Sequence, residues 1–232
     1  MKLLGLIGGV SPESTEIYYR LLNDAAKARL GGDHSQRMIV WSFDFSLMHH
    51  LYSTGDWAGY ERAIVEAGLT LKPTGVDALM ICSNTSNMAA DAVRAATGLP
   101  VIDLPAALAA AVRKAGSRRP LLLGTPFTME GDFYRPTLRE AHGCETLIPN
   151  AEDRETVGRI IMDELVAGVV KESSRRAYLD VIERGRAAGA DGVILGCTEI
   201  CMLIGQEHVD LPVFDTTRIH AAAASAYAFG ET

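Results

Sequence analysis

The segment Gly75–Thr85 reads GVDALMICSNT, and Gly189–Glu199, 114 residues further along the chain, reads GADGVILGCTE. In both segments a glycine and an aspartate precede a short apolar run, and small or polar residues follow it. An apolar run of this length between such residues predicts a short, buried strand. The alignment of the two segments places Ser83 opposite Cys197.

Two further pairs of segments match in the same order along the chain. Leu6–Gly9 (LIGG) aligns with Leu122–Thr125 (LLGT) at an offset of 116 residues, and Leu99–Asp103 (LPVID) aligns with Leu211–Asp215 (LPVFD) at an offset of 112. A glycine and an aspartate before an apolar strand are common in α/β units, which would explain one match. Three ordered matches at nearly one offset predict an internal duplication.

Short apolar runs alternate with longer amphipathic segments over the whole chain. The short runs predict strands at Leu3–Ile7, Met38–Trp41, Ala78–Cys82, Val101–Asp103, Leu121–Leu123, Glu145–Ile148, Gly192–Leu195 and Val213–Asp215. Apolar residues at three- and four-residue spacing predict helices within Ser14–Arg29, Trp57–Pro73, Asn87–Thr97, Arg154–Val170 and Ser173–Ala188. This alternation predicts an α/β fold with parallel sheets covered by helices on both faces.

The duplication predicts two similar three-layer α/β half-domains related by pseudo-twofold symmetry. We expect an N-terminal domain of residues 1–98 plus 212–232 and a C-terminal domain of residues 99–211, with the active site in the cleft between them. The last strand, Val213–Asp215, belongs to the first half if the second LPV segment completes that sheet by exchange.

Composition narrows the class of function. With 22 basic and 29 acidic residues, the formal net charge is −7, which argues against nucleic-acid binding. The sequence contains no run of about 18 apolar residues and no signal peptide, so we expect neither a membrane span nor secretion. Four cysteines without a secretion signal should be free thiols. We therefore expect a cytoplasmic protein that acts on a small molecule.

Four loops should lie at the carboxyl ends of strands, where open parallel sheets bind ligands. They are Gly8–Ser11, Cys82–Thr85, Gly124–Phe127 and Gly196–Glu199. Small side chains and free N–H groups before a helix suit an anion such as a substrate carboxylate, although helix caps prefer the same residues for structural reasons. The predicted substrate-binding residues are Gly9, Ser11, Asn84, Thr85, Thr125, Thr198 and Glu199.

The pair Ser83 and Cys197 is the candidate catalytic centre. A cysteine that ends a buried strand and opens a helix lies where thiol pKa values fall, so it can serve as a base or nucleophile. Pseudo-twofold symmetry would place Ser83 across the cleft, and two groups on opposite faces of one carbon can invert its configuration. The alternative is that Cys197 is a small buried apolar residue, as we expect for Cys144 and Cys201.

Cofactor chemistry finds no support in the sequence, and we expect neither a cofactor nor a metal. No dinucleotide, P-loop or G-x-S-x-G motif occurs. His49 and His50 are adjacent, which is not the spacing of a helical metal pair, and no cysteine pair has C-x-x-C spacing. No lysine has the context expected for pyridoxal phosphate.

The chain resembles the aspartate/glutamate racemase family of cofactor-independent amino-acid racemases, nearest to its bacterial broad-specificity or acidic-amino-acid branch. The motifs that carry the resemblance are Gly8–Thr15 (GGVSPEST), Asn84-Thr85, Leu123–Glu130 (LGTPFTME), Leu195–Ile200 (LGCTEI) and Val213–His220 (VFDTTRIH). Members typically use two cysteines, one from each half, as acid and base on the α-carbon. The resemblance implies that Cys197 is the C-terminal member and that the protein is a homodimer.

Three positions depart from the family pattern. Ser83 replaces the N-terminal cysteine, although the branch nearest this chain also carries a hydroxyl residue there. Asn87 stands where many members have histidine. The segment Asp44–Met48 has no basic residue for a side-chain carboxylate, and only His49 and His50 are near it. A preference for acidic substrates therefore does not follow from this segment.

The sequence as a whole predicts an amino-acid racemase that inverts the α-carbon of aspartate, glutamate or a broader range of amino acids. Cys197 and Ser83 would act on opposite faces, and Ser11 and Thr125 would line the cleft. Two alternatives stay open. One is a single-cysteine decarboxylase or isomerase of small dicarboxylates on the same fold, and the other is a non-catalytic small-molecule binder.

Overall fold

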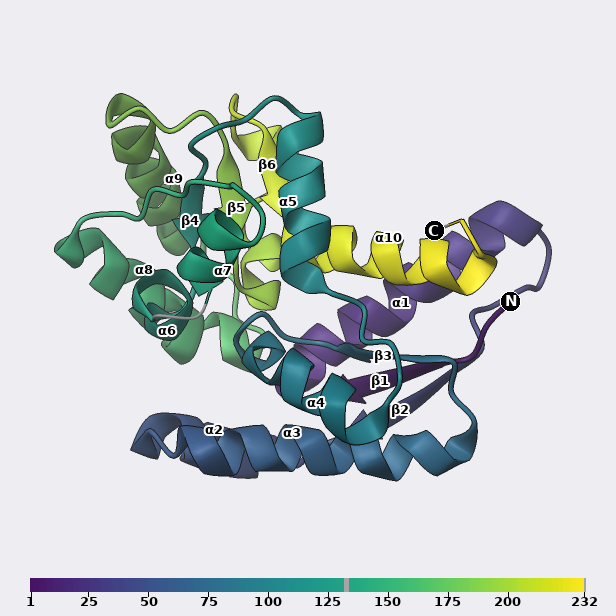
Figure 1. The fold of residues 1–232 in the computed structure, drawn as a ribbon. Helices are drawn as coiled ribbons and strands as arrows, with labels where there is room; N and C mark the ends of the chain where they lie inside the picture. The colour runs from purple at the N-terminus through teal and green to yellow at the C-terminus, as the bar shows by residue number, and fades with distance from the viewer. Residues whose placement is uncertain (132–133, 232) are drawn as a thin grey trace. The chain divides into compact units, whose positions relative to one another are not determined.

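The computed structural model describes residues 1–131 and 134–231 (Figure 1). The chain forms two compact units, Met1–Asp103 with His220–Thr232 and Leu104–Ile219. Among the described residues no helix has the length and apolar character needed to cross a membrane.

The first unit is built on a parallel sheet of order β2-β1-β3. Leu4 pairs with Met38 on one side and with Ala78 on the other. An isolated parallel bridge from Leu79 to Val101 extends the sheet beyond β3. The elements are β1 (Leu4–Gly8), α1 (Pro12–Leu30), β2 (Met38–Ser42), α2 (Phe45–Thr54), α3 (Trp57–Leu71), η1 (Lys72–Thr74), β3 (Ala78–Ile81), η2 (Thr85–Ala89), α4 (Ala90–Thr97) and most of α10 (Thr216–Phe229).

Alternate residues of the central strands face two separate apolar cores, as the strand period of two requires. One face packs against α1 and α10 through Leu4, Leu6, Ala78, Met80, Cys82, Tyr18, Leu22, Ala221 and Ala224. The opposite face packs against α3 and α4 through Ile7, Leu79, Ile81, Tyr60, Ile64 and Val93. The unit therefore has three layers, which confirms that part of the predicted fold class (Figure 1).

The second unit has a parallel sheet of order β4-β5-β6, which an isolated bridge from Leu121 to Leu147 extends at the other edge. Its elements are α5 (Leu104–Lys114), β4 (Leu121–Leu123), α6 (Pro126–Glu130), α7 (Tyr134–Glu140), α8 (Ala151–Asp163), η3 (Leu165–Ala167), α9 (Glu172–Ala187), β5 (Val193–Leu195), η4 (Thr198–Met202), η5 (Gln206–His208) and β6 (Val213–Asp215). Helices α5 and α7 cover one face of this sheet, and α8 and α9 cover the other. It is again a three-layer unit.

The two units repeat one pattern of strand pairing and one side-chain anchor. Asp77 accepts the Leu3 N–H ahead of β1 at 2.6 Å, and Asp191 accepts the Arg119 N–H ahead of β4 at 2.9 Å. Leu3 and Arg119 are 116 residues apart, the same offset that aligns the first strands of the two halves. The glycine–aspartate motif of the repeat thus ties the start of each central strand to its neighbour.

The expectation that Val213–Asp215 joins the first sheet is wrong. This strand is β6, and it pairs with β5 in the second sheet, Val193 opposite Val213. In the first unit Leu79 bridges to Val101 in the same way, so each LPV segment completes the sheet of its own repeat. The chain returns to the first unit only at His220, within α10.

Sequence periodicity also left several elements unpredicted. Helices α2, α5, α7 and α10 were not among the expected segments. Both α5 and α10 are rich in alanine, and α2 contains no Lys, Arg, Asp or Glu, so alternation of apolar and charged residues is weak in all three.

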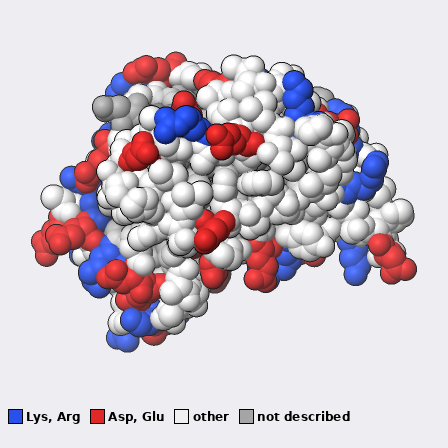
Figure 2. Space-filling model, turned by 90° about the horizontal axis from the view of Figure 1, so that it is seen from below, with Lys and Arg blue, Asp and Glu red and all other residues white. Residues whose placement is uncertain are grey.

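In Figure 2, which views the molecule from the side of α2 and α3 in Figure 1, charged side chains are dispersed among many uncharged ones.

His220 is a fully buried hydrogen-bonded histidine where the chain re-enters the first unit. Its Nδ1 lies 3.0 Å from the Tyr18 hydroxyl and its Nε2 lies 3.0 Å from the Ile102 carbonyl oxygen. Because a carbonyl only accepts, Nε2–H is the donor and Nδ1 accepts from Tyr18. Burial lowers the pKa of His220 to about 4. The imidazole is therefore neutral in the folded chain above that pH.

This histidine predicts a loss of stability in mild acid. Below the ordinary histidine pKa of about 6.5, His220 binds a proton in the unfolded chain but stays neutral in the folded chain. The contribution of His220 to the free energy of unfolding therefore falls between pH 6.5 and about pH 4, and does not fall further below that. Between pH 7 and pH 5 the contribution is about 2 kcal/mol. Urea unfolding of the wild type and His220→Gln at both pH values should show the wild type losing that much more stability. An equal change in both proteins would contradict the prediction.

Candidate active site

The strand-end loops of the first unit bring Gly9 and Ser11, after β1, to the same sheet edge as Ser83, Asn84 and Thr85, after β3. Gly9 has a φ of +76°, and a Cβ there would collide with the backbone of Phe43, so only glycine suits this turn. Its N–H donates to Thr15 Oγ1 at 2.8 Å. The backbone is held close against the end of β2.

Ser11 has a structural task at this edge. Its Oγ caps α1 by accepting the Ser14 N–H at 3.1 Å. Ser14 Oγ in turn donates to the Cys82 carbonyl at 2.8 Å, which links the loop after β1 to the loop after β3. Ser11 and Ser14 thus hold the two loops in place together, and contact of Ser11 with a substrate stays a prediction.

Ser83 is half-buried, whereas Asn84 and Thr85 are buried at the start of η2. The Ser83 N–H donates to the Ile81 carbonyl at 2.8 Å, and its Oγ accepts the Ser86 N–H at 3.3 Å. Cys82 faces the other way, into the core beneath α1 and α10, and burial raises the pKa of its thiol. The alternation along β3 predicted this orientation.

In the second unit Cys197, Thr198 and Glu199 form a buried hydrogen-bonded cluster directly after β5. Cys197 Sγ donates to Glu199 Oε2 at 2.9 Å, and Thr198 Oγ1 donates to the same oxygen at 2.8 Å. Cys197 is 8% exposed and Glu199 is 4% exposed. The cluster therefore holds a thiol and a carboxylate in contact, shielded from bulk water.

The expectation of a lowered thiol pKa at Cys197 is wrong. Burial, followed by the negative charge of Glu199 and its hydrogen bond from the thiol, raises the pKa of Cys197 well above its ordinary value. Cys197 precedes the short 3₁₀-helix η4 as its N-cap, without a side-chain capping bond. At rest the group is thus a thiol that donates to a carboxylate.

Thr125 lies on the neighbouring strand end of the same sheet. Its Oγ1 accepts the Thr128 N–H at 3.3 Å as the N-cap of α6. The Gly196 N–H donates to the Leu123 carbonyl at 2.6 Å, so the ends of β4 and β5 are in direct contact. The structure therefore brings Thr125, Thr198 and Glu199 to the edge that carries Cys197.

Two further residues, Thr216 and Asn87, which were not among the predicted catalytic or substrate-binding residues, also lie at these strand ends. Thr216 Oγ1 donates to the Leu195 carbonyl at 2.6 Å, two residues before Cys197. Asn87 Nδ2 donates to the carbonyls of Ile81 and Ser83 at 3.1 and 2.6 Å. The repeat aligns Ile81 with Leu195. That alignment is the sequence signal that could have pointed to the side-chain donors of these two backbone carbonyls.

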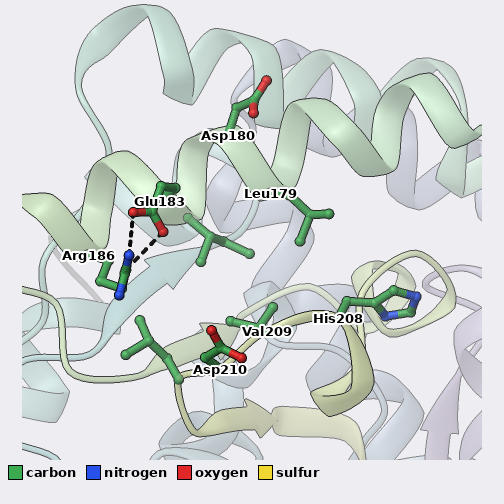
Figure 3. Close-up of a pocket in the computed structure, with 9 residues that line it drawn as sticks. Leu179, Asp180, Glu183, Arg186, His208, Val209 and Asp210 are labelled. Carbon is green, nitrogen blue, oxygen red and sulfur yellow. Dashed lines mark hydrogen bonds and ion pairs between the residues drawn. The ribbon is translucent and has the colours of Figure 1, made fainter.

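A cavity of about 310 Å³ lies elsewhere on the second unit (Figure 3). It is lined by α9 from Leu179 to Arg186 and by His208–Leu211, which directly precede β6. This is the amino end of β6, whereas the candidate site lies at carboxyl ends. Arg186 on its rim is already paired with Glu183. Among the described residues, no group of His, Cys, Asp and Glu side chains could hold a metal ion.

A family model for Asp/Glu/Hydantoin racemases matches residues 7–224. The chain belongs to this family. The match covers both units and all the candidate site residues, which confirms the resemblance drawn from the sequence. The two solved structures and the two curated relatives in the next two paragraphs likewise carry racemase names.

Two solved structures resemble the whole chain. An Asp/Glu racemase candidate from Yersinia pestis is 45% identical, with a TM-score of 0.91 and coverage of 99% of this chain and 100% of that one. An aspartate racemase homologue from Pyrococcus horikoshii is 33% identical, with a TM-score of 0.86 and the same coverage. They confirm the predicted two-unit α/β fold class.

Curated relatives match more weakly. The broad specificity amino-acid racemase RacX of Bacillus subtilis is 19% identical over 93% of each chain. A glutamate racemase of Synechococcus is 30% identical over 54% of this chain and 44% of its own length. The aligned segment thus spans less than half of that enzyme.

The Cys197–Glu199 contact makes a prediction about thiol ionisation. Glu199→Gln removes the negative charge that helps to raise the pKa of Cys197, so that pKa should fall. The rate of Cys197 alkylation by iodoacetamide, followed by mass spectrometry across pH, should rise at lower pH than in the wild type. Glu155→Gln, which removes an exposed carboxylate on α8 of the same unit, is the matched control and should leave the profile in place. An unchanged or higher pKa in Glu199→Gln would contradict the role assigned to its charge.

Proposed function

We propose that the protein is a cofactor-independent amino-acid racemase, with Cys197 and Ser83 acting on opposite faces of the substrate α-carbon. The observation that carries the proposal is the buried contact of Cys197 Sγ with Glu199 Oε2 at 2.9 Å. Ser83 occupies the equivalent place after β3 in the duplicated unit. Membership of the racemase family supports the same reaction.

The Cys197 cluster suits transfer of a proton to and from carbon. As a base, the thiol first passes its proton to Glu199, whose Oε2 already accepts it, and Thr198 Oγ1 donates a second hydrogen bond to the same oxygen. The α-proton of an amino acid is very weakly acidic, so a thiolate with a raised pKa is the stronger base for it. Sulfur takes the proton, and the C–H electron pair moves into the substrate carboxylate.

Ser83 would return a proton from the opposite face. Its Oγ accepts the Ser86 N–H, which leaves its hydroxyl proton available for donation and stabilises the oxygen when that proton leaves. A hydroxyl is a weaker acid than a thiol, so this half of the reaction depends closely on how Ser83 is held. In the reverse direction the two groups exchange roles.

Backbone N–H groups around Asn84-Thr85 and Thr198-Glu199 would bind the substrate α-carboxylate and the charge that develops on it. Gly9, Ser11 and Thr125 would line the remaining wall. We propose acidic amino acids or a broader range as substrates, since the relatives named above include an aspartate racemase homologue and a broad-specificity enzyme. No cofactor is needed for this proton transfer. A homodimer in the cytoplasm completes the proposal.

The first test is a screen of both enantiomers of all the standard amino acids by chiral chromatography. Wild type should racemise at least one of them, and Cys197→Ala should be slower by about 10²-fold or more, because general acid–base catalysis supplies factors of that size. Cys144→Ala, which removes a buried thiol from the core of the same unit, should keep the activity per folded molecule. Full activity in Cys197→Ala would contradict the mechanism.

The second test separates the two faces of the α-carbon. In deuterated water, Ser83→Ala should racemise about 10²-fold more slowly. It should still exchange the α-proton of one enantiomer, with retention of configuration, because Cys197 can return a deuteron to the face it has just deprotonated. Cys197→Ala should not deuterate that enantiomer. If Ser83→Ala exchanged both enantiomers equally, Ser83 would not be the acid–base group of one face.

The same incubations can detect the alternative reactions. Release of carbon dioxide from malonate derivatives, or isomerisation of maleate, without amino-acid racemisation would indicate a single-cysteine enzyme. Arylmalonate decarboxylase shares the fold at 15% identity and a TM-score of 0.52. Ligand-induced thermal stabilisation without any turnover would indicate a binding protein.

A further inference from the structure

Asn87 is a buried amide that clamps the end of β3. Its side chain is 2% exposed, and Nδ2 donates to the Ser83 carbonyl at 2.6 Å and the Ile81 carbonyl at 3.1 Å. The Oδ1 atom is buried without a hydrogen-bond partner among the described residues. The assignment of Nδ2 toward the carbonyls is the chemically sensible one, because Oδ1 in that place would repel both oxygens.

These two bonds hold the backbone that carries Ser83. The Ser83 N–H donates to the Ile81 carbonyl, which also accepts from Asn87, so the backbone on both sides of Cys82 is held in one turn. Ser83 Oγ is held separately by the Ser86 N–H. Without the amide, the Ser83 carbonyl would lose its buried donor, and the turn that carries the hydroxyl would lose one of its constraints.

The second unit has a corresponding clamp, made by a different residue. The Leu195 carbonyl, at the repeat position of Ile81, accepts from Thr216 Oγ1 at 2.6 Å. In both units a buried side-chain donor thus holds the last strand carbonyl, two residues before the proposed acid–base group. Asparagine makes this bond in one unit and threonine makes it in the other. This recurrence with unrelated residue types indicates that the donor is needed to hydrogen-bond the carbonyl and not to fill the surrounding space.

We propose that Asn87 is a positioning residue for Ser83, which orients its hydroxyl through the two carbonyl bonds and takes no part in proton transfer itself. This inference rests on the proposed racemase function. The two bonds also satisfy backbone carbonyls and so stabilise the loop, and the variants below therefore measure the Ser83 face of the reaction separately from folding.

The test combines substitutions with the exchange assay. Asn87→Leu keeps the number and branching of the side-chain heavy atoms and removes both donors, so racemisation should fall about 10-fold or more, while α-deuteration with retention by Cys197 persists. That remaining exchange also shows that the variant is folded. In a Ser83→Ala background, Asn87→Leu should lower the residual racemisation by less than about twofold, because its effect passes through Ser83.

Thr216→Val is the matched control, since it removes the donor from the equivalent carbonyl beneath Cys197. Its effect should be as large in Ser83→Ala as in the wild type. Asn87→Asp supplies a second variant. An ionised carboxylate offers no donor and a protonated one offers a single O–H, so its activity relative to the wild type should rise as the pH falls, whereas that of Asn87→Leu should not.

Three results would overturn the inference on its own. The first is that the losses of racemisation rate in Asn87→Leu and Ser83→Ala multiply in the double variant, as independent effects do. The second is that a folded Asn87→Leu no longer exchanges the α-proton on the Cys197 face. The third is that the activity of Asn87→Asp relative to the wild type does not change with pH. If the wild type racemises no amino acid, the proposed function fails and this inference fails with it. Racemisation by the wild type combined with any of the three results contradicts the role of Asn87 alone.

Discussion

The parallel pairing of β1 with β3 and of β4 with β5 is the constraint on which the rest of the structure depends. Parallel strands end at the same edge of a sheet, so residues distant in the sequence become neighbours there. In each unit the aspartate of the repeated motif accepts an N–H ahead of the first strand and helps to set that pairing. Every candidate site residue follows one of these four strands.

Burial changes the chemistry of the edge after β5. A cysteine near a helix start is ordinarily expected to be acidic, yet here the thiol lies beside a carboxylate in a site with little water. Both conditions raise its pKa, and they make Glu199 the natural acceptor of its proton. A group that is protonated at rest and strongly basic once ionised suits exchange with a carbon acid better than a permanent thiolate would.

Much of this could be predicted from the sequence, because the relevant signals are local. Short apolar runs identified the central strands, helical spacing identified five of the helical regions, and the repeat identified two matched units. The alanine-rich helices α5 and α10 were not predicted, because the side chains on their buried faces differ from the others in size and not in polarity. Val101–Asp103 and Glu145–Ile148 reduce to single bridges, since pairing length depends on the neighbouring strand.

The sequence by itself determined the duplication, the family and the positions of Ser83 and Cys197, since these depend on residue order alone. Only the tertiary structure decided that β6 completes the second sheet, that the Cys197 thiol donates to Glu199, and that Asn87 and Thr216 hold the carbonyls beneath the two candidate groups. The physical reason is that sheet membership, burial and hydrogen bonding are set by what surrounds a residue in space. Neighbours in the chain give little information about those surroundings.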